Sequence, residues 1–231
     1  MINQKNIWQI LFFIDAVLNL YAEATHNIPL VYITKPLLMI LLSLHFYFNG
    51  LNDQIYGKLL LVGLFFSFLG DTFLMFRETG TQSQQLFLLG LGSFLITHIL
   101  YFMAFWKYAR GWKFIKKQPY LIILFLLFLF GNTAFLWPDL VTAFKIPVFV
   151  YSFAITIMVL SCVNLYQETP NSIFLFLLIG VILFMCSDTL IGLNQFKKET
   201  IVIPYPRIII MSTYILAQFL IVKGSIALMK E

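Results

Sequence analysis

Two aspartates lie inside strongly apolar stretches of the sequence. Asp188 belongs to LIGVILFMCSDTLIGLNQF (178–196), and Asp71 belongs to FFSFLGDTFLMF (65–76). Each aspartate follows a small residue and precedes a threonine. An ionised carboxylate inside a membrane helix costs about 2.5–3.5 kcal/mol on insertion scales, so both side chains should face protein or water rather than lipid. Their matching contexts predict a site with two carboxylates, although a carboxylate can also serve only to link helices.

Three more polar residues lie close to these aspartates along the chain or at a similar expected depth. Lys35 precedes Pro36, and it could be a counter-ion for an aspartate, a contact for an anionic substrate or a lysine that snorkels to the interface. Arg77 follows Asp71 by six residues. Its planar guanidinium suits a lipid phosphate, and an ordinary interfacial arginine is the alternative. Asn194 could contact a head group or only cap its helix.

Polar side chains also recur at helical spacing in two other apolar stretches. His98 and Tyr101 are three residues apart, in line with Gly90, Ser93 and Thr97. Tyr214 and Gln218 form an i, i+4 pair near the carboxyl end. Both stripes could line a cavity or simply mediate helix packing through hydroxyl groups and small residues.

Asp15, Asn19 and Glu23 form a third polar face, in the first apolar stretch. They have no matching partners elsewhere in the sequence, so we assign them packing or interfacial roles.

Metal and cofactor chemistry has no motif in this sequence. The histidines, His26, His45 and His98, are scattered, so a three-histidine zinc site is not expected. Cys162 and Cys186 lie in apolar stretches as small apolar residues. We therefore expect acid–base chemistry without a metal or cofactor.

Composition places these residues in a membrane protein. Of the 231 residues, 61% are hydrophobic and 11% are charged, whereas soluble domains are about 45–50% apolar. The mean hydropathy is +0.90. The net charge of +5 reflects basic residues between apolar runs, which membrane topology explains without nucleic-acid binding.

The apolar runs predict an all-α, polytopic fold with eight transmembrane helices in a single domain, residues 1–231. Lys5 and the Ala22–Glu23–Ala24 sequence resemble a signal peptide, but the polar residues of the first run indicate a retained helix. The predicted spans are Ile7–Ala22, Leu30–Phe48, Tyr56–Phe76, Leu86–Trp106, Tyr120–Trp137, Leu140–Tyr166, Ile173–Leu193 and Tyr205–Leu228.

Basic residues predict the orientation. The gap between the fourth and fifth spans carries five of them and no acidic residue, so it should be cytoplasmic, together with both termini. Under this topology Asp71 and Asp188 each lie about five residues from the outer ends of their helices, about 7–8 Å deep, and Lys35 lies at nearly the same depth. We expect a bacterial inner membrane rather than the endoplasmic reticulum, and the sequence does not indicate the oligomeric state.

Two short matches indicate two parallel four-helix repeats. Lys35-Pro36 corresponds to Lys145-Ile146-Pro147, and Gly70-Asp71-Thr72 corresponds to Ser187-Asp188-Thr189, four spans apart in both cases. An even number of spans relates the halves by an axis along the membrane normal.

The combined motifs resemble the YhhN family of lysoplasmalogenase-like membrane proteins, which includes the TMEM86 proteins. The resemblance covers the second to the eighth span and rests on short sequences in five of them: Lys35-Pro36-Leu37, the run from Ser67 to Asp71, the run from Gly90 to Phe94 with His98 and Tyr101, Ser187-Asp188 with Asn194 and Phe196, and Tyr214 with Ala217-Gln218.

The resemblance implies an eight-helix hydrolase that cleaves the vinyl-ether bond of lysoplasmalogens to a fatty aldehyde and a glycerophospho-base, with a lysophospholipid as its partner in the membrane. Such a reaction needs a neutral acid and a nearby anion. Two carboxylates in a site of low dielectric can divide these roles. We therefore expect Asp71 and Asp188 to be the acid/base pair, with Lys35 favouring one anion.

Three other functions fit the same residues. A transporter or channel could use Asp71, Asp188 and Lys35 to bind protons or a solute. An intramembrane aspartyl protease also uses two membrane aspartates, although Phe68 replaces the first glycine of its usual G-x-G-D sequence. A structural membrane subunit would use the aspartates only for folding.

Overall fold

All the secondary structure described in the computed structural model is helical. The structure describes residues 4–49, 55–77 and 83–231. Its contacts divide the chain into two units, Met1–Ala104 with Ser225–Glu231, and Phe105–Gly224.

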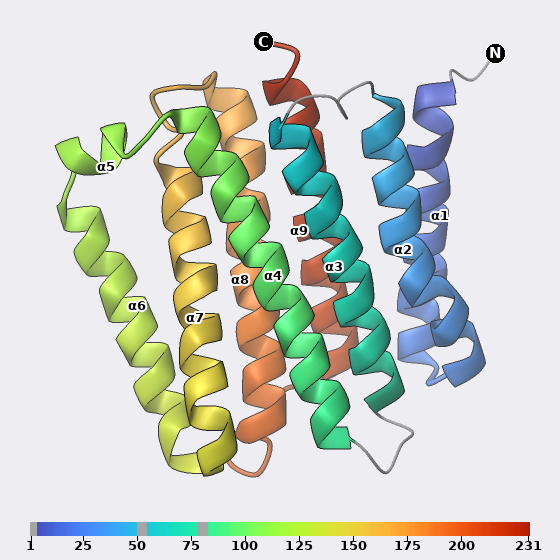
Figure 1. The fold of residues 1–231 in the computed structure, drawn as a ribbon. Helices are drawn as coiled ribbons and strands as arrows, with labels where there is room; N and C mark the ends of the chain where they lie inside the picture. Colours follow the sequence, from blue (N-terminus) through green and yellow to red (C-terminus); the bar gives the residue numbers. More distant parts are fainter. Residues whose placement is uncertain (1–3, 50–54, 78–82) are drawn as a thin grey trace. The chain divides into compact units, whose positions relative to one another are not determined.

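The first unit contains three helices that pack in sequence order, followed by most of a fourth (Figure 1). They are α1 (Gln4–Ala24), α2 (Ile28–Phe48), α3 (Ile55–Arg77) and α4 (Ser83–Ala109). A tight turn joins α1 to α2, with His26 at φ 53°. The Asn27 side chain accepts a hydrogen bond from the Leu30 amide at 3.2 Å, and Pro29 occupies the first turn of α2. These residues begin α2 because the cap satisfies an amide that has no partner inside the helix.

Glycines allow α3 and α4 to pack closely. A Cβ atom on Gly70 would lie 2.7 Å from the Phe94 ring. A Cβ on Gly90 would lie 2.8 Å from Leu74 and 3.3 Å from the Gly70 carbonyl oxygen. The region around Asp71 is therefore built on backbone contact between these two helices.

Two contacts show that α1 begins, and the last helix of the chain ends, on the same side of the first unit. The Trp8 ring, near the start of α1, stacks on Phe48 at the end of α2, with 5.7 Å between ring centroids. The Tyr56 hydroxyl, at the start of α3, lies 2.9 Å from Ser225, near the end of α9 (Pro206–Leu228). This agrees with an even number of spans.

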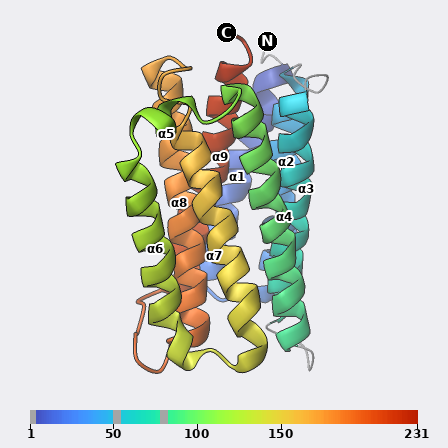
Figure 2. The same cartoon turned by 60° about the vertical axis from the view of Figure 1, so that its left-hand side comes forward.

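The second unit contains the remaining helices, of which α6, α7 and α8 lie side by side (Figure 2). The helices of this unit are α5 (Lys113–Lys117), α6 (Tyr120–Leu136), the short 3-10 helix η1 (Trp137–Asp139), α7 (Thr142–Val163), α8 (Asn171–Phe196) and most of α9. Gly180 brings α8 close to α9, since its Cβ would lie 2.9 Å from the Ile221 amide nitrogen.

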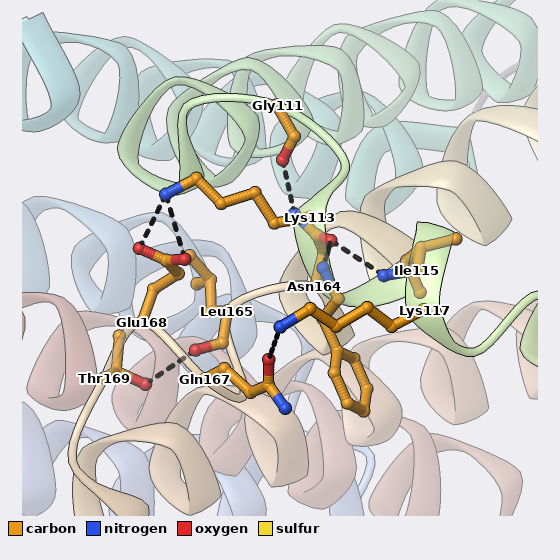
Figure 3. Close-up of polar contacts among 10 residues, drawn as sticks. Gly111, Lys113, Ile115, Lys117, Asn164, Leu165, Gln167, Glu168 and Thr169 are labelled. Carbon is orange, nitrogen blue, oxygen red and sulfur yellow. Dashed lines mark hydrogen bonds and ion pairs between the residues drawn. The ribbon is translucent and has the colours of Figure 1, made fainter.

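One asparagine organises the segment between α4 and α6 (Figure 3). Asn164, at the end of α7, accepts hydrogen bonds from the Phe114 and Ile115 amides at 3.0 and 3.1 Å. Its own amide group donates to the Gly111 carbonyl at 2.6 Å. Lys113 also pairs with Glu168 at 3.0 Å. The basic segment is thereby fastened to the connection between α7 and α8.

Eight helices in the described ranges are long and apolar enough to cross a membrane. They coincide with the eight predicted spans, with ends that differ by a few residues. The chain is therefore an all-α, multi-pass membrane protein, as predicted. The helices α5 and η1 were not predicted, because segments of five and three residues carry too little periodicity to detect.

Candidate functional site

In the second unit, Asp188 is the centre of a buried polar cluster. It lies on α8 beside Ser187, and both side chains are buried. The Tyr151 hydroxyl of α7 donates a hydrogen bond to the Asp188 Oδ2 atom. A phenol that donates to a carboxylate stabilises its negative charge and fixes its orientation. The cluster can therefore hold an oriented anion inside an apolar helix bundle.

The predicted residues Tyr214 and Gln218 join this cluster from α9. The Tyr214 ring packs edge to face on Phe184, one turn before Asp188, with 5.6 Å between centroids. The Gln218 amide donates to the Tyr214 hydroxyl at 3.4 Å. Both side chains are buried. The i, i+4 spacing thus places the pair on the face of α9 that packs against α8.

Tyr151 was missed by the sequence analysis. It follows Pro147 by four residues, so it lies one helical turn further along α7. A tyrosine is common in an aromatic membrane protein, and here the chain has 11 of them. The Lys145-Ile146-Pro147 match lies at the start of this helix, and the Tyr151 hydroxyl lies one turn beyond it.

In the first unit, Asp71 is buried on α3, one turn after Ser67. The Ser67 hydroxyl lies 3.2 Å from that of Thr97 on α4 and also hydrogen-bonds to Tyr101. Thr97 further donates to the Gly63 carbonyl at 3.0 Å. His98 and Tyr101 are fully buried. The predicted stripe of α4 therefore faces α3 and forms a polar network one turn from Asp71.

Lys35 is paired with Glu23, a residue for which a packing or interfacial role is expected from the sequence. Its ammonium nitrogen lies 3.6 Å from Glu23 Oε1 of α1, and the Glu23 side chain is only 4% exposed. Val31 of α2 and Met75 of α3 belong to the same core cluster and therefore lie at one level. Lys35 lies one turn after Val31, and Asp71 lies one turn before Met75. Because α2 and α3 run in opposite directions, Lys35 and Asp71 lie at the same level of the unit, as the topology predicted.

The helix ends change the expected depth of both aspartates. Asp71 lies six residues before the end of α3, and Asp188 lies eight residues before the end of α8. At 1.5 Å per residue these positions are about 9 and 12 Å from the helix ends, deeper than the predicted 7–8 Å. The difference for Asp188 arises because α8 continues three residues past the predicted end at Leu193.

The two remaining predicted residues lie at these helix ends. Asn194 is half-buried in the last turn of α8, where the Phe196 ring packs on Phe144 of α7 at 5.5 Å. Arg77 ends α3, and its side chain lies outside the described part of the chain.

No group of three or more His, Cys, Asp or Glu side chains in the described part could hold a metal ion. The two clusters instead combine carboxylates with hydroxyl groups, an amide and an imidazole. These groups can orient, donate and accept protons.

Known proteins resemble this chain over most of its length. A model of the YhhN family matches residues 30–225. The chain is 34% identical to the lysoplasmalogenase TMEM86A of Bos taurus over 168 residues, which are 71% of this chain and 64% of that protein. Its identity to the human lysoplasmalogenase TMEM86A is 33%, with the same coverage. A lysoplasmalogenase of Mycobacterium tuberculosis is 28% identical over 60% of this chain and 50% of its own length.

The chain thus spans less than two thirds of the length of these relatives. No solved structure is significantly similar to it. The family match includes every residue predicted for the site, from Lys35 to Gln218, and it leaves out α1.

Proposed function

Because the chain belongs to the YhhN family, we propose that it is a membrane hydrolase that cleaves the vinyl-ether bond of lysoplasmalogens. Relatives named lysoplasmalogenase support this assignment. The structural observation that carries it is the buried Asp188 carboxylate, which accepts a hydrogen bond from Tyr151. A buried, oriented anion is the group that the reaction requires near its cationic intermediate.

The proposed reaction adds water across the vinyl ether and then breaks a carbon–oxygen bond. An acid transfers a proton to the vinyl carbon that is remote from the ether oxygen, and an oxocarbenium ion forms. Water attacks this cation and loses a proton to a base, which gives a hemiacetal. The hemiacetal then collapses: its hydroxyl proton passes to the glycerol oxygen and the carbon–oxygen bond breaks. The products are a fatty aldehyde and a glycerophospho-base with a free hydroxyl group, and one water is consumed.

We assign the two proton transfers to Asp71 and Asp188. Asp188 is suited to the role of anion and base because the Tyr151 hydroxyl stabilises a carboxylate. Asp71 is then the acid that protonates the vinyl carbon. This division resembles that of glycosidases, whose two carboxyl groups act on an oxocarbenium-like transition state. A shared reaction requires both carboxyl groups to reach the same substrate.

The remaining site residues are proposed as contacts for the lipid. Lys35 is paired with Glu23 and lies at the level of Asp71, and its positive charge is proposed to attract the phosphate of the substrate. Arg77 and Asn194 are proposed to contact the head group from the ends of α3 and α8. His98, Tyr101, Tyr214 and Gln218 are proposed to line the site, and the lipid tail would lie among the apolar helices.

Aldehyde release from lysoplasmenylethanolamine by detergent-purified protein tests this function. We expect release of a fatty aldehyde, and a slower rate in heavy water because a proton is transferred to carbon. The matched alkyl-ether lipid has no double bond to protonate, so it should remain intact. No aldehyde from the vinyl ether, or equal cleavage of the saturated ether, would refute the assignment. Proteoliposome flux without lipid turnover would instead favour a transporter.

A further inference from the structure

The first helix buries a polar face and exposes an apolar one. Asp15, Asn19 and Glu23 succeed one another at intervals of one turn, and each side chain is at most 4% exposed. The opposite face carries Ile14 and Val17, which are 53% and 68% exposed. Since α1 packs against α2, its polar face lies within the helix pair. This face also lies outside the region matched by the family.

A directional chain of hydrogen bonds leads from this face into α2. The Asn19 amide donates to Thr34 Oγ1 at 2.9 Å, and the Thr34 hydroxyl donates to the Leu30 carbonyl at 2.9 Å. The side-chain nitrogen of Asn19 therefore points toward α2. Its side-chain oxygen is left to accept a hydrogen bond from another donor. Within the described residues, neither Asn19 Oδ1 nor Asp15 Oδ2 has a hydrogen-bond partner, and both atoms are buried.

These two oxygen atoms create an electrostatic problem that a single proton solves. A carboxylate and an amide oxygen are both acceptors, so they cannot bond to each other, and a buried unpaired acceptor is costly. A proton on Asp15 turns its oxygen into a donor for an acceptor one turn away, such as Asn19 Oδ1. The chain would then run in one direction from Asp15 through Asn19 and Thr34 to the Leu30 carbonyl.

The charged groups around Asp15 favour a proton over an ion pair. Lys35 is engaged by Glu23, two turns from Asp15 along α1. The Asn19–Thr34 hydrogen bond places Leu38 of α2 opposite Asp15, because the two helices are antiparallel. His45 lies about 10 Å further along α2 than Leu38, too far to pair with Asp15. The titratable residues of α2, which packs against α1, are Tyr32, Lys35, His45 and Tyr47. A metal ion would need more oxygen ligands than this site offers, because helical carbonyls are already bonded within the helices.

We propose that Asp15 and Asn19 form a buried binding site for one proton, which ties α1 to α2 when it is occupied. Asp15 is a neutral carboxylic acid in the folded protein and ionises when the α1–α2 pair opens. Folding of this pair therefore takes up one proton, and the folded state is favoured by a lower pH. This property is independent of the proposed lipid hydrolysis.

Infrared spectroscopy of wild type and Asp15→Asn tests the proposal directly. Asparagine keeps the shape and a donor group but has no ionisable proton. At neutral pH, the wild-type spectrum should contain the carbonyl stretch of a protonated carboxyl group that Asp15→Asn lacks. Glu168→Gln, which removes an exposed acid, should retain this band. A wild-type spectrum without the band, or a band of equal intensity in wild type and Asp15→Asn, would overturn the proposal; any band from the proposed acid Asp71 is common to both proteins.

Thermal unfolding against pH provides the second measurement. As the pH rises, the melting temperature of wild type should fall relative to that of Asp15→Asn. The expected slope is about 3–5 °C per pH unit, which corresponds to one proton released on unfolding. Parallel curves would overturn the proposal, as would a sodium-specific rise in melting temperature that Asp15→Asn abolishes. If Asp15→Asn does not fold, Asn19→Leu serves instead: the wild-type band should shift because its acceptor is gone, and an unchanged band would contradict the site.

Discussion

At the scale of single residues, the hydroxyl group of Tyr151 decides how Asp188 is presented. The carboxylate is buried on α8, and the hydroxyl reaches it from the neighbouring helix α7. Its loss would leave an apolar ring against the carboxylate, without the donor that orients it. Tyr151 is thus proposed as a positioning residue, one that acts on the reaction through Asp188.

Tyr151→Phe should lower kcat for aldehyde release by about 10- to 100-fold, because a hydrogen bond to a charged group contributes about 1.5–3 kcal/mol. The protein should still fold, since the ring is retained. Initial rates at saturating lysoplasmenyl lipid measure this effect. Tyr120→Phe, which removes an exposed hydroxyl at the start of α6, is the control. A wild-type kcat for Tyr151→Phe would show that this hydroxyl does not contribute to the reaction.

At the scale of helices, close backbone contact positions the polar clusters. Gly180 packs α8 against α9 two turns before Asp188, and Gly70 packs α3 against α4 directly before Asp71. A Cβ atom at Gly180 would meet the backbone of α9, and a Cβ atom at Gly70 would meet the Phe94 ring of α4. The glycines thereby couple helix packing to the placement of each aspartate.

Gly180→Ala should destabilise the folded protein by about 1–3 kcal/mol, because its Cβ would lie 2.9 Å from the Ile221 nitrogen and 3.1 Å from the Ala217 carbonyl oxygen. Gly131→Ala in α6 is the matched control, since a Cβ there meets nothing within 4 Å. It should raise stability by up to about 1 kcal/mol through helix propensity. Unfolding in detergent measures both, and equal effects would contradict the packing argument.

The fastening of the basic segment by Asn164 is also a property of the elements (Figure 3). Asn164→Ala removes the acceptor for the Phe114 and Ile115 amides. We expect hydrogen exchange at these two amides to become about 10- to 100-fold faster, as the loss of a buried partner costs about 1–3 kcal/mol. Asn132→Ala, which loses one 3.4 Å contact with Ser152, should leave their exchange unchanged. Undiminished protection in Asn164→Ala would show that other contacts hold the segment.

At the scale of the whole molecule, the distribution of basic residues predicts the topology. The segment between α4 and α6 carries Lys107, Arg110, Lys113, Lys116 and Lys117. We expect reporter fusions at the carboxyl terminus and in this segment to be cytoplasmic. A fusion in the connection between α6 and α7 should be on the opposite side. A carboxyl-terminal reporter on that opposite side would refute an orientation with both termini in the cytoplasm.

Much of this fold could be predicted from the sequence because apolar runs of about 20 residues permit few structures. The eight spans followed from that constraint, and so did the expectation that Asp71 and Asp188 avoid lipid, in agreement with their burial. The common level of Lys35 and Asp71 followed from counting residues along antiparallel helices.

The partners of these residues could not be predicted in the same way, because pairing depends on how each helix is rotated about its axis. Lys35 pairs with Glu23, and Asp188 accepts a hydrogen bond from Tyr151. Neither pairing follows from depth alone. Helix rotation is set by side-chain packing, such as the fit of Gly180 against Ile221. A uniformly apolar helix offers no amphipathic stripe from which that rotation could be read.

The central claim is that Asp71 and Asp188 both take part in cleavage of the vinyl ether. The most direct measurement is the rate of aldehyde release from lysoplasmenylethanolamine by wild type, Asp71→Asn and Asp188→Asn, each shown to be folded by its melting curve. The account predicts that each variant loses at least about 100-fold in kcat, the lower range for a positioned acid or base. A folded variant of either aspartate that releases aldehyde at the wild-type rate would contradict it.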